Sequence, residues 1–142
     1  MLNDGNKMPI IALGTFGSKN DIVNKVSQSV IWAIEAGYRH IDTASVYLNE
    51  EEVGKAIKNV TARGIVKRED LFITTKLDFG YTGSKVVSAL NTSLNKLRLD
   101  YVDLYLIHIP NNFNFVQSHR RNKNGFIDYP YLLTKYSNNI CI

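Results

Sequence analysis

The chain has 142 residues, 44% of them hydrophobic, which is enough for one folded domain and too apolar for a disordered protein. Its formal charge of +4 at pH 7 is small for a nucleic-acid-binding protein, and no apolar stretch reaches the length that crosses a membrane. The single cysteine, Cys141, cannot form an internal disulfide, and the first residues lack the pattern of a signal peptide. We therefore expect a cytoplasmic protein that binds neither nucleic acid nor a membrane.

The chain begins with residues that predict a turn, a strand and a helix. Residues 3–6 have the composition of a tight turn and predict a small N-terminal hairpin. Residues 10–13 are expected to form a first buried strand, which Gly14 ends. A helix that ends at Gly37 follows, because apolar residues recur at helical spacing. These residues are Ile22, Val26, Val30, Ala33 and Ile34.

A second strand and helix come next. Residues 38–41 predict a short strand with Asp42 at its carboxyl end. A helix is expected from Glu50, where acidic residues cluster as they do at helix N-termini, and Glu51 and Lys55 are spaced for an i,i+4 ion pair. The apolar stripe of this helix comprises Val53, Ile57 and Val60.

The same alternation continues along the chain. Residues 71–75 predict a third strand with Lys76 at its end, and residues 101–107 predict a fourth strand that His108 closes. Between them Ser84 is expected to cap a third helix. The inward-facing residues of that helix should be Val87, Leu90, Leu94 and Leu97.

Strands that alternate with amphipathic helices predict right-handed βαβ units and a parallel sheet. A Rossmann fold would need a complete Gly-x-Gly-x-x-Gly turn after the first strand, and residues 14–17 contain only part of it. We therefore predict an α/β fold: a partial TIM (β/α)8 barrel with about four βα units after the N-terminal hairpin.

Residues 37–57 closely resemble the first signature of the aldo-keto reductases. The segment reads Gly-Tyr-Arg-His-Ile-Asp-Thr-Ala-Ser-Val-Tyr-Leu-Asn-Glu-Glu-Glu-Val-Gly-Lys-Ala-Ile and matches without a gap. Residues 94–110 also resemble the family segment that leads to its catalytic histidine. The resemblance implies the same barrel as the pattern of strands and helices.

Four polar residues stand where such a barrel would place its chemistry. Asp42, Lys76 and His108 each lie at the carboxyl end of a different predicted strand, and Tyr47 lies in the loop after the second strand. Carbonyl reduction needs a proton on oxygen, and a tyrosine with an ordinary pKa of about 10 is a reluctant donor unless a neighbouring ammonium favours its phenolate. Lys76 can supply this charge, Asp42 can pair with Lys76, and His108 can orient the carbonyl oxygen. The resemblance implies these same roles, with Tyr47 as the general acid.

Each of these residues also has a structural explanation when it is taken alone. Asp42 could be a turn residue, Lys76 a solvated strand end and His108 a partner for a backbone group. Tyr47 could pack on the surface. Their joint placement at matching strand ends, within two segments that resemble the family, favours the catalytic interpretation.

The resemblance also implies a cofactor and a substrate. Gly14, Thr15 and Phe16 are similar to the family's Gly-Thr-aromatic loop beside the nicotinamide, although an ordinary turn after a strand would look the same. The implied cofactor is NADPH, held in part by these residues and Asp42, and the implied substrate is a small carbonyl compound. The substrate mouth would be lined by Phe16, Val46, Tyr47, His108 and the less securely aligned Phe79. No metal site is expected.

The resemblance ends near Pro110. Residues 1–110 are predicted to form the N-terminal half of the barrel, and residues 111–142 a divergent tail that is disordered or contains a short helix. The family's Gly-x-Ser-Asn segment and the later basic loop, which hold the cofactor, are not found. Half a barrel leaves the first and fourth strands as open edges.

Two functions follow from this sequence. The first is an NADP-dependent oxidoreductase that reduces aldehydes and ketones to alcohols, in a truncated form with an incomplete cofactor site. The alternative is a non-catalytic half-barrel that acts as an interaction or regulatory fragment and associates with itself through its open sheet edges.

Overall fold

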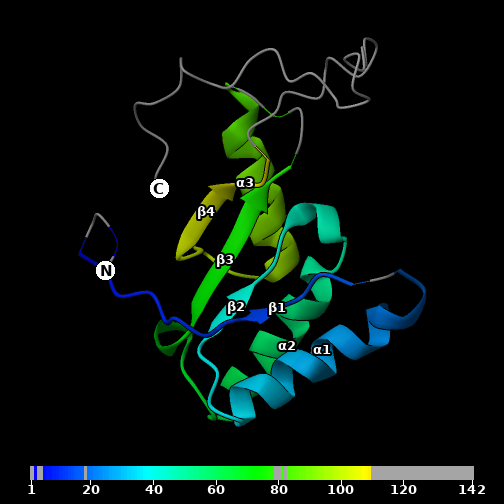
Figure 1. Cartoon of the computed structure of the whole chain (residues 1–142), viewed down its shortest axis with the longest axis vertical. Helices are drawn as coiled ribbons and strands as arrows, with labels where there is room; N and C mark the ends of the chain where they lie inside the picture. Colours follow the sequence, from blue (N-terminus) through cyan, green and yellow to red (C-terminus); the bar gives the residue numbers. More distant parts are fainter. Residues whose placement is uncertain (1, 3–4, 18, 79–80, 82, 110–142) are drawn as a thin grey trace, which may run out of the picture.

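The computed structural model describes residues 2, 5–17, 19–78, 81 and 83–109, with the backbone alone for residues 19–24. These residues form four strands and three longer helices in regular alternation (Figure 1). In chain order the elements are β1 (Leu13–Gly14), α1 (Lys19–Glu35), β2 (His40–Asp42), α2 (Glu50–Ala62), β3 (Phe72–Leu77), α3 (Lys85–Leu97) and β4 (Leu104–Ile107). Two short 3-10 turns, Ser45–Tyr47 and Arg68–Asp70, precede α2 and β3.

The strands form one parallel sheet in the order β1-β2-β3-β4. Figure 1 shows β3 and β4 side by side with their arrowheads at the same end. Parallel neighbours joined through a helix are βα units, and their order in the sheet follows the chain. This arrangement confirms the predicted α/β fold, a partial (β/α)8 barrel.

The pleat of the sheet separates its core side from its functional side. Ile41 and Ile73 are paired in the register and fully buried, on the side that packs against the helices. Asp42 is paired with Thr74, one residue further along each strand, so these side chains lie on the opposite side. Lys76, two residues after Thr74, shares that side. The alternation therefore brings Asp42 and Lys76 to one face of the sheet.

The hydrophobic core lies between the sheet and the helices. One cluster of buried side chains draws on α1, α2, α3 and the central strands, and includes Val30, Ile34, Ile41, Val53, Ile57, Val60, Ile73 and Leu97. Burying an aliphatic side chain of this size contributes roughly 1.5–3 kcal/mol. The predicted stripe of α2 is thus confirmed, as are Val26, Val30 and Ile34 of α1, whereas Ala33 is only half-buried.

The first strand differs from the prediction. Residues 10–13 were expected to be buried, but β1 comprises only Leu13–Gly14, and the side chains of Ile10 and Ile11 are 99% and 68% exposed. They precede the paired part of the sheet, where no described helix covers them. The predicted N-terminal hairpin falls in part on residues 3–4, which lie outside the described residues; on either side of them, Leu2 N donates to Asn6 O at 2.8 Å.

Two details of the helices also differ. Lys55 pairs with Glu52, three residues earlier, rather than with Glu51. Val87 is 65% exposed instead of facing inward, because the first turns of α3 rise past the ends of the strands in Figure 1. Ser84 occupies the N-cap position of α3 but makes no side-chain capping bond. The expectations for Phe79 and for residues 111–142 lie outside the described residues.

The part of the chain that the structure describes contains no helix long and apolar enough to cross a membrane.

Candidate active site

The sheet brings the four predicted catalytic residues to its carboxyl edge. Asp42 is the last residue of β2, Lys76 is the next-to-last residue of β3, and His108 directly follows β4. Tyr47 ends the 3-10 turn between β2 and α2. Residues from three strands and one loop therefore meet at one end of the sheet.

Lys76 connects three of the elements at this edge. Its Nζ donates to a carboxylate oxygen of Asp42, to the carbonyl oxygen of Thr43 at 2.9 Å, and to the hydroxyl of Tyr47 at 3.4 Å. The Lys76 side chain is 12% exposed and that of Asp42 is 38% exposed. A cation so poorly hydrated needs such partners, and they hold its charge beside the tyrosine hydroxyl.

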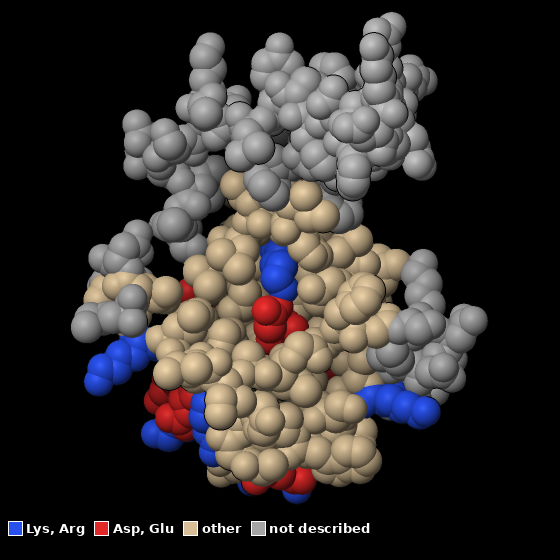
Figure 2. Space-filling model, in the orientation of Figure 1, with Lys and Arg blue, Asp and Glu red and all other residues tan. Residues whose placement is uncertain are grey.

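The ring of Tyr47 is packed from two sides. Its centroid lies 5.1 Å from that of Phe16 and 5.5 Å from that of His108, and both contacts are edge-to-face. Lys76 Nζ lies 5.1 Å from the same ring centroid. Figure 2 shows a basic and an acidic patch meeting in the middle of a mostly uncharged face, with other charges at its margin.

His108 is kept neutral by its surroundings. Burial lowers the pKa of His108 below its ordinary value of 6.5, and the positive charge of Lys76 lowers it further. The carboxylates of Asp78 and Asp42 act in the opposite direction but do not reverse the shift. A neutral imidazole carries one N–H at pH 7 and can donate it to a ligand oxygen.

The predicted cofactor loop borders the same site. Gly14 ends β1, and the backbone N–H of Thr15 donates to Asp42 O at 2.9 Å. Phe16 is 77% exposed beside Tyr47, and Val46 is half-buried in the next loop. Thr15 is 6% exposed, and its hydroxyl points to Thr43 rather than outward. The loop therefore offers an open glycine and an aromatic ring, while the Thr15 side chain faces inward.

Sequence reasoning missed three buried polar residues beside the site: Thr43, Asn49 and Glu50. Glu50 is 1% exposed and accepts a hydrogen bond at 2.7 Å from the hydroxyl of Thr75. Its spacing from Val53 and Ile57 places it on the buried face of α2, a signal that the acidic cluster at the helix start concealed.

The carboxylate of Glu50 acts on a second buried group behind the sheet. Tyr105 lies opposite Thr75 in the register and is 5% exposed. Burial, and then the charge of Glu50, raises the pKa of Tyr105 to about 12. This tyrosine is therefore a neutral core residue, whereas Tyr47 lies on the open side of the sheet.

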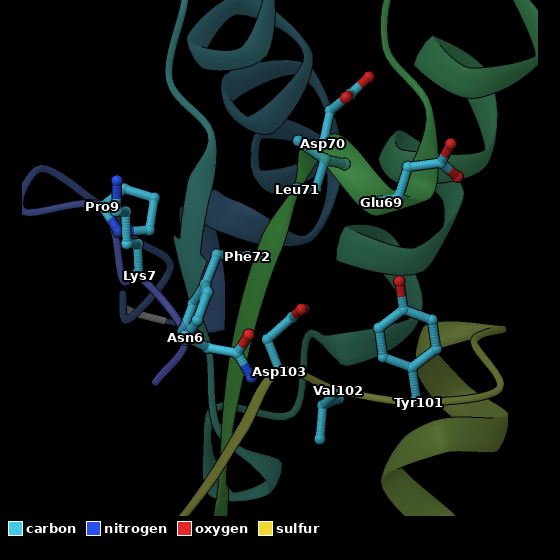
Figure 3. Close-up of a pocket in the computed structure, with 10 residues that line it drawn as sticks. All are labelled: Asn6, Lys7, Pro9, Glu69, Asp70, Leu71, Phe72, Tyr101, Val102 and Asp103. Atoms are coloured by element: carbon cyan, nitrogen blue, oxygen red, sulfur yellow. The ribbon is translucent and has the colours of Figure 1, made fainter. Parts of the chain in front are cut away.

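A cavity of about 420 Å³ lies at the opposite, amino-terminal edge of the sheet. Figure 3 shows Phe72 and Asp103, near the starts of β3 and β4, with Tyr101 across the cavity from Pro9. The other lining residues are Asn6, Lys7, Glu69, Asp70, Leu71 and Val102. None of the candidate catalytic residues lines this cavity.

The conserved-family model of the "Aldo/keto reductase family" matches residues 11–114 of the chain. The chain belongs to this family. It is 57% identical over 113 residues to aldo-keto reductase AKR2E4 of Bombyx mori, covering 77% of this chain and 37% of that protein. It is also 50% identical over 110 residues to human aldo-keto reductase family 1 member C4, covering 77% of this chain and 34% of that protein.

A solved structure gives the same result for the fold. The crystal structure of Bombyx mori AKR2E4 in complex with NADP is similar with a TM-score of 0.74 and 50% sequence identity. The match covers 89% of this chain and 40% of the other chain. The chain spans about a third of the length of the curated reductases that it matches.

Proposed function

We propose that this chain supplies the proton-transfer site of an NADPH-dependent oxidoreductase that reduces aldehydes or ketones to alcohols. The supporting observation is the position of Lys76, which is paired with Asp42 while its Nζ lies 3.4 Å from Tyr47 Oη. A tyrosine hydroxyl beside a fixed cation can release its proton to a developing alkoxide, because the cation stabilises the resulting phenolate.

Each residue of the site has a role in this reaction. Tyr47 transfers the proton from Oη to the carbonyl oxygen, and Lys76 stabilises the negative charge that the transfer leaves on the phenol. Asp42 holds Lys76 in place. His108, neutral because its pKa is lowered, donates a hydrogen bond to the same carbonyl oxygen and orients it. Bound NADPH would supply the hydride that the carbonyl carbon accepts.

The residues around Tyr47 fit a nicotinamide and a small carbonyl compound. A Cβ placed on Gly14 would meet nothing within 4 Å, so the space above the end of β1 is open. Gly14, Thr15, Phe16 and Asp42 would hold the nicotinamide half of the cofactor. The substrate mouth would be formed by Phe16, Val46, Tyr47 and His108. The NADP in the crystal structure of the Bombyx mori relative supports this choice of cofactor.

The division of the chain and its location belong to the same proposal. We assign residues 1–110 to the half-barrel and residues 111–142 to a separate tail. One cysteine in 142 residues suits a reducing compartment, which supports the cytoplasm, and the small net charge of +4 gives no support to a nucleic-acid partner.

The reaction is tested with the Tyr47→Phe variant in an NADPH-dependent aldehyde reduction assay. Removing the proton donor should lower kcat by about 10²- to 10⁴-fold, the usual contribution of a general acid. Tyr38→Phe is the matched control, since Tyr38 is 38% exposed before β2 and has no part in the site. Equal turnover by the two variants, or no turnover by the folded parent chain, would refute the proposal.

A second candidate function follows from the sheet edges. Within the described residues β1 and β4 each pair on one side only. Apolar side chains are exposed near both edges: Ile10 is 99% exposed, and Ile107 and Ile109 are 45% and 39% exposed. Open parallel edges with apolar flanks favour association. The chain would then act as a non-catalytic interaction or regulatory fragment that binds a second copy of itself.

Sedimentation velocity distinguishes this function from a monomeric enzyme. Ile107→Lys places a charge on the exposed edge of β4 and should shift an associated sample to the monomer. Val87→Lys adds the same charge at a residue on α3 that is 65% exposed and away from either edge. A monomeric parent chain, or equal shifts in both variants, would rule out association through the β4 edge.

A further inference from the structure

Asn49 is a buried polar residue two positions after Tyr47. It stands at the N-cap of α2 and is 5% exposed, but its side chain makes no capping hydrogen bond. Its Nδ2 instead donates to the carbonyl oxygen of Thr15 at 2.7 Å, and its Oδ1 lies 3.4 Å from the Thr43 hydroxyl. An asparagine at this position usually stabilises its own helix. Here its amide joins the first loop of the sheet to the second.

The two threonines close this network. The hydroxyl of Thr15 donates to that of Thr43 at 2.9 Å, and both residues are buried, at 6% and 0% exposed. Each member adjoins part of the candidate site: Phe16 follows Thr15, and the Thr43 carbonyl accepts from Lys76. The network therefore adjoins two neighbours of Tyr47, the ring of Phe16 and the ammonium of Lys76.

Leu48, which lies beside this network, has a strained backbone conformation. It lies between Tyr47 and Asn49 with φ 57° and ψ 27°, in the left-handed region. This conformation costs a residue with a side chain roughly 1–2 kcal/mol. Because the Leu48 side chain is 60% exposed, its own packing offsets little of that cost. A strained residue of this kind persists when its neighbours fix it from both sides.

We propose that Asn49 is a positioning residue: its buried amide holds the left-handed turn at Leu48 and thereby keeps the Tyr47 ring between Phe16 and His108. The turn reverses the chain so that Tyr47 faces the open side of the sheet and Asn49 faces the interior. Without the bond to Thr15, the turn relaxes toward right-handed or extended backbone and carries the tyrosine away from Lys76. The catalytic use of Tyr47 rests on the function proposed above. The position of its ring between Phe16 and His108 does not depend on that function.

The contact between Tyr47 and Phe16 reports this geometry without any turnover. In the 142-residue chain with ¹³C-labelled aromatic residues, nuclear Overhauser cross-peaks should join the two rings, whose centroids are 5.1 Å apart. Asn49→Ala should abolish these cross-peaks. Asn59→Ala, the same change at an exposed position of α2, should preserve them.

A rescue variant separates positioning from general stability. Glycine adopts the left-handed conformation without steric cost, so Leu48→Gly added to Asn49→Ala should restore the cross-peaks. Cross-peaks that persist in Asn49→Ala would overturn the proposal. So would a double variant that stays unfolded or lacks the cross-peaks, because Asn49 would then act on the fold as a whole. An inactive chain with intact cross-peaks and rescue would refute only the reductase function.

Discussion

The Lys76 ammonium is the group through which the residues of the candidate site act on one another. It bonds to Asp42, to the Thr43 carbonyl and to the Tyr47 hydroxyl, and its side chain is 12% exposed. Removing Asp42 would leave the poorly solvated Lys76 ammonium without its carboxylate partner, which is costlier than losing a surface ion pair. The geometry proposed for proton transfer and the local stability of the sheet edge therefore depend on the same contacts.

The lowered pKa of His108 predicts a pH dependence of folding. Below about 6.5 the unfolded chain binds a proton on this imidazole that the folded chain resists, because burial and Lys76 disfavour the charged form. The free energy of unfolding should therefore fall as the pH drops from 7.5 toward 5.5. Urea unfolding at several pH values should show a smaller fall in His108→Gln. Parallel pH profiles for the two proteins would contradict this prediction.

The candidate catalytic residues could be named from the sequence, but the buried polar residues beside them could not. Asp42, Lys76 and His108 are polar residues at the ends of apolar strands, a position that is informative in any parallel sheet. Asn49 and Glu50 look like ordinary residues of a helix start. Their burial depends on Thr15 and Thr75, which come from other elements, and no local pattern reports such contacts.

The packing of α2 against α3 depends on a glycine. A Cβ on Gly54 would lie 2.4 Å from the carbonyl oxygen of Leu97 and 2.9 Å from its Cα, which are backbone atoms that cannot rotate away. Gly54→Ala should therefore separate the end of α3 from α2 and lower the free energy of unfolding by about 1–3 kcal/mol or more. Denaturant titration measures the loss.

Gly14→Ala is the matched control for that measurement. A Cβ at Gly14 meets nothing within 4 Å, so the change in unfolding free energy should stay within about 0.5 kcal/mol. If both variants lost a similar free energy of unfolding, the two glycines would act through backbone freedom alone. A stable Gly54→Ala protein would show that the helices tolerate wider spacing.

The helices were largely predictable where apolar residues recur at helical spacing over a long stretch. α1, α2 and α3 appear where their apolar stripes indicated, and residues of all three helices join the core, although in α3 only Leu97 of the predicted stripe is buried and Leu90 and Leu94 are half-buried. The predictions failed at element ends. The burial of Ile10, Ile11 and Val87 depends on what lies beyond the element, and there the described structure offers no cover.

At the scale of the whole molecule, the described residues form a four-stranded parallel sheet with helices, matching part of a family barrel. The same pleat that buries Ile41 and Ile73 turns Asp42 and Lys76 to the other side. The described βα units thus bring together the candidate proton-transfer residues, since all of them lie on consecutive units. The proposed function depends on whether these βα units also bind a cofactor.

A titration of the purified 142-residue chain with NADPH, followed by cofactor fluorescence, tests that property most directly. We expect saturable binding that Phe16→Ala weakens, because this ring, 77% exposed beside Tyr47, borders the proposed nicotinamide site. Trp32→Ala removes a similarly exposed aromatic side chain from α1 and should leave binding unchanged. The absence of saturable binding by a folded sample, or equal losses of affinity in both variants, would contradict the proposed cofactor site.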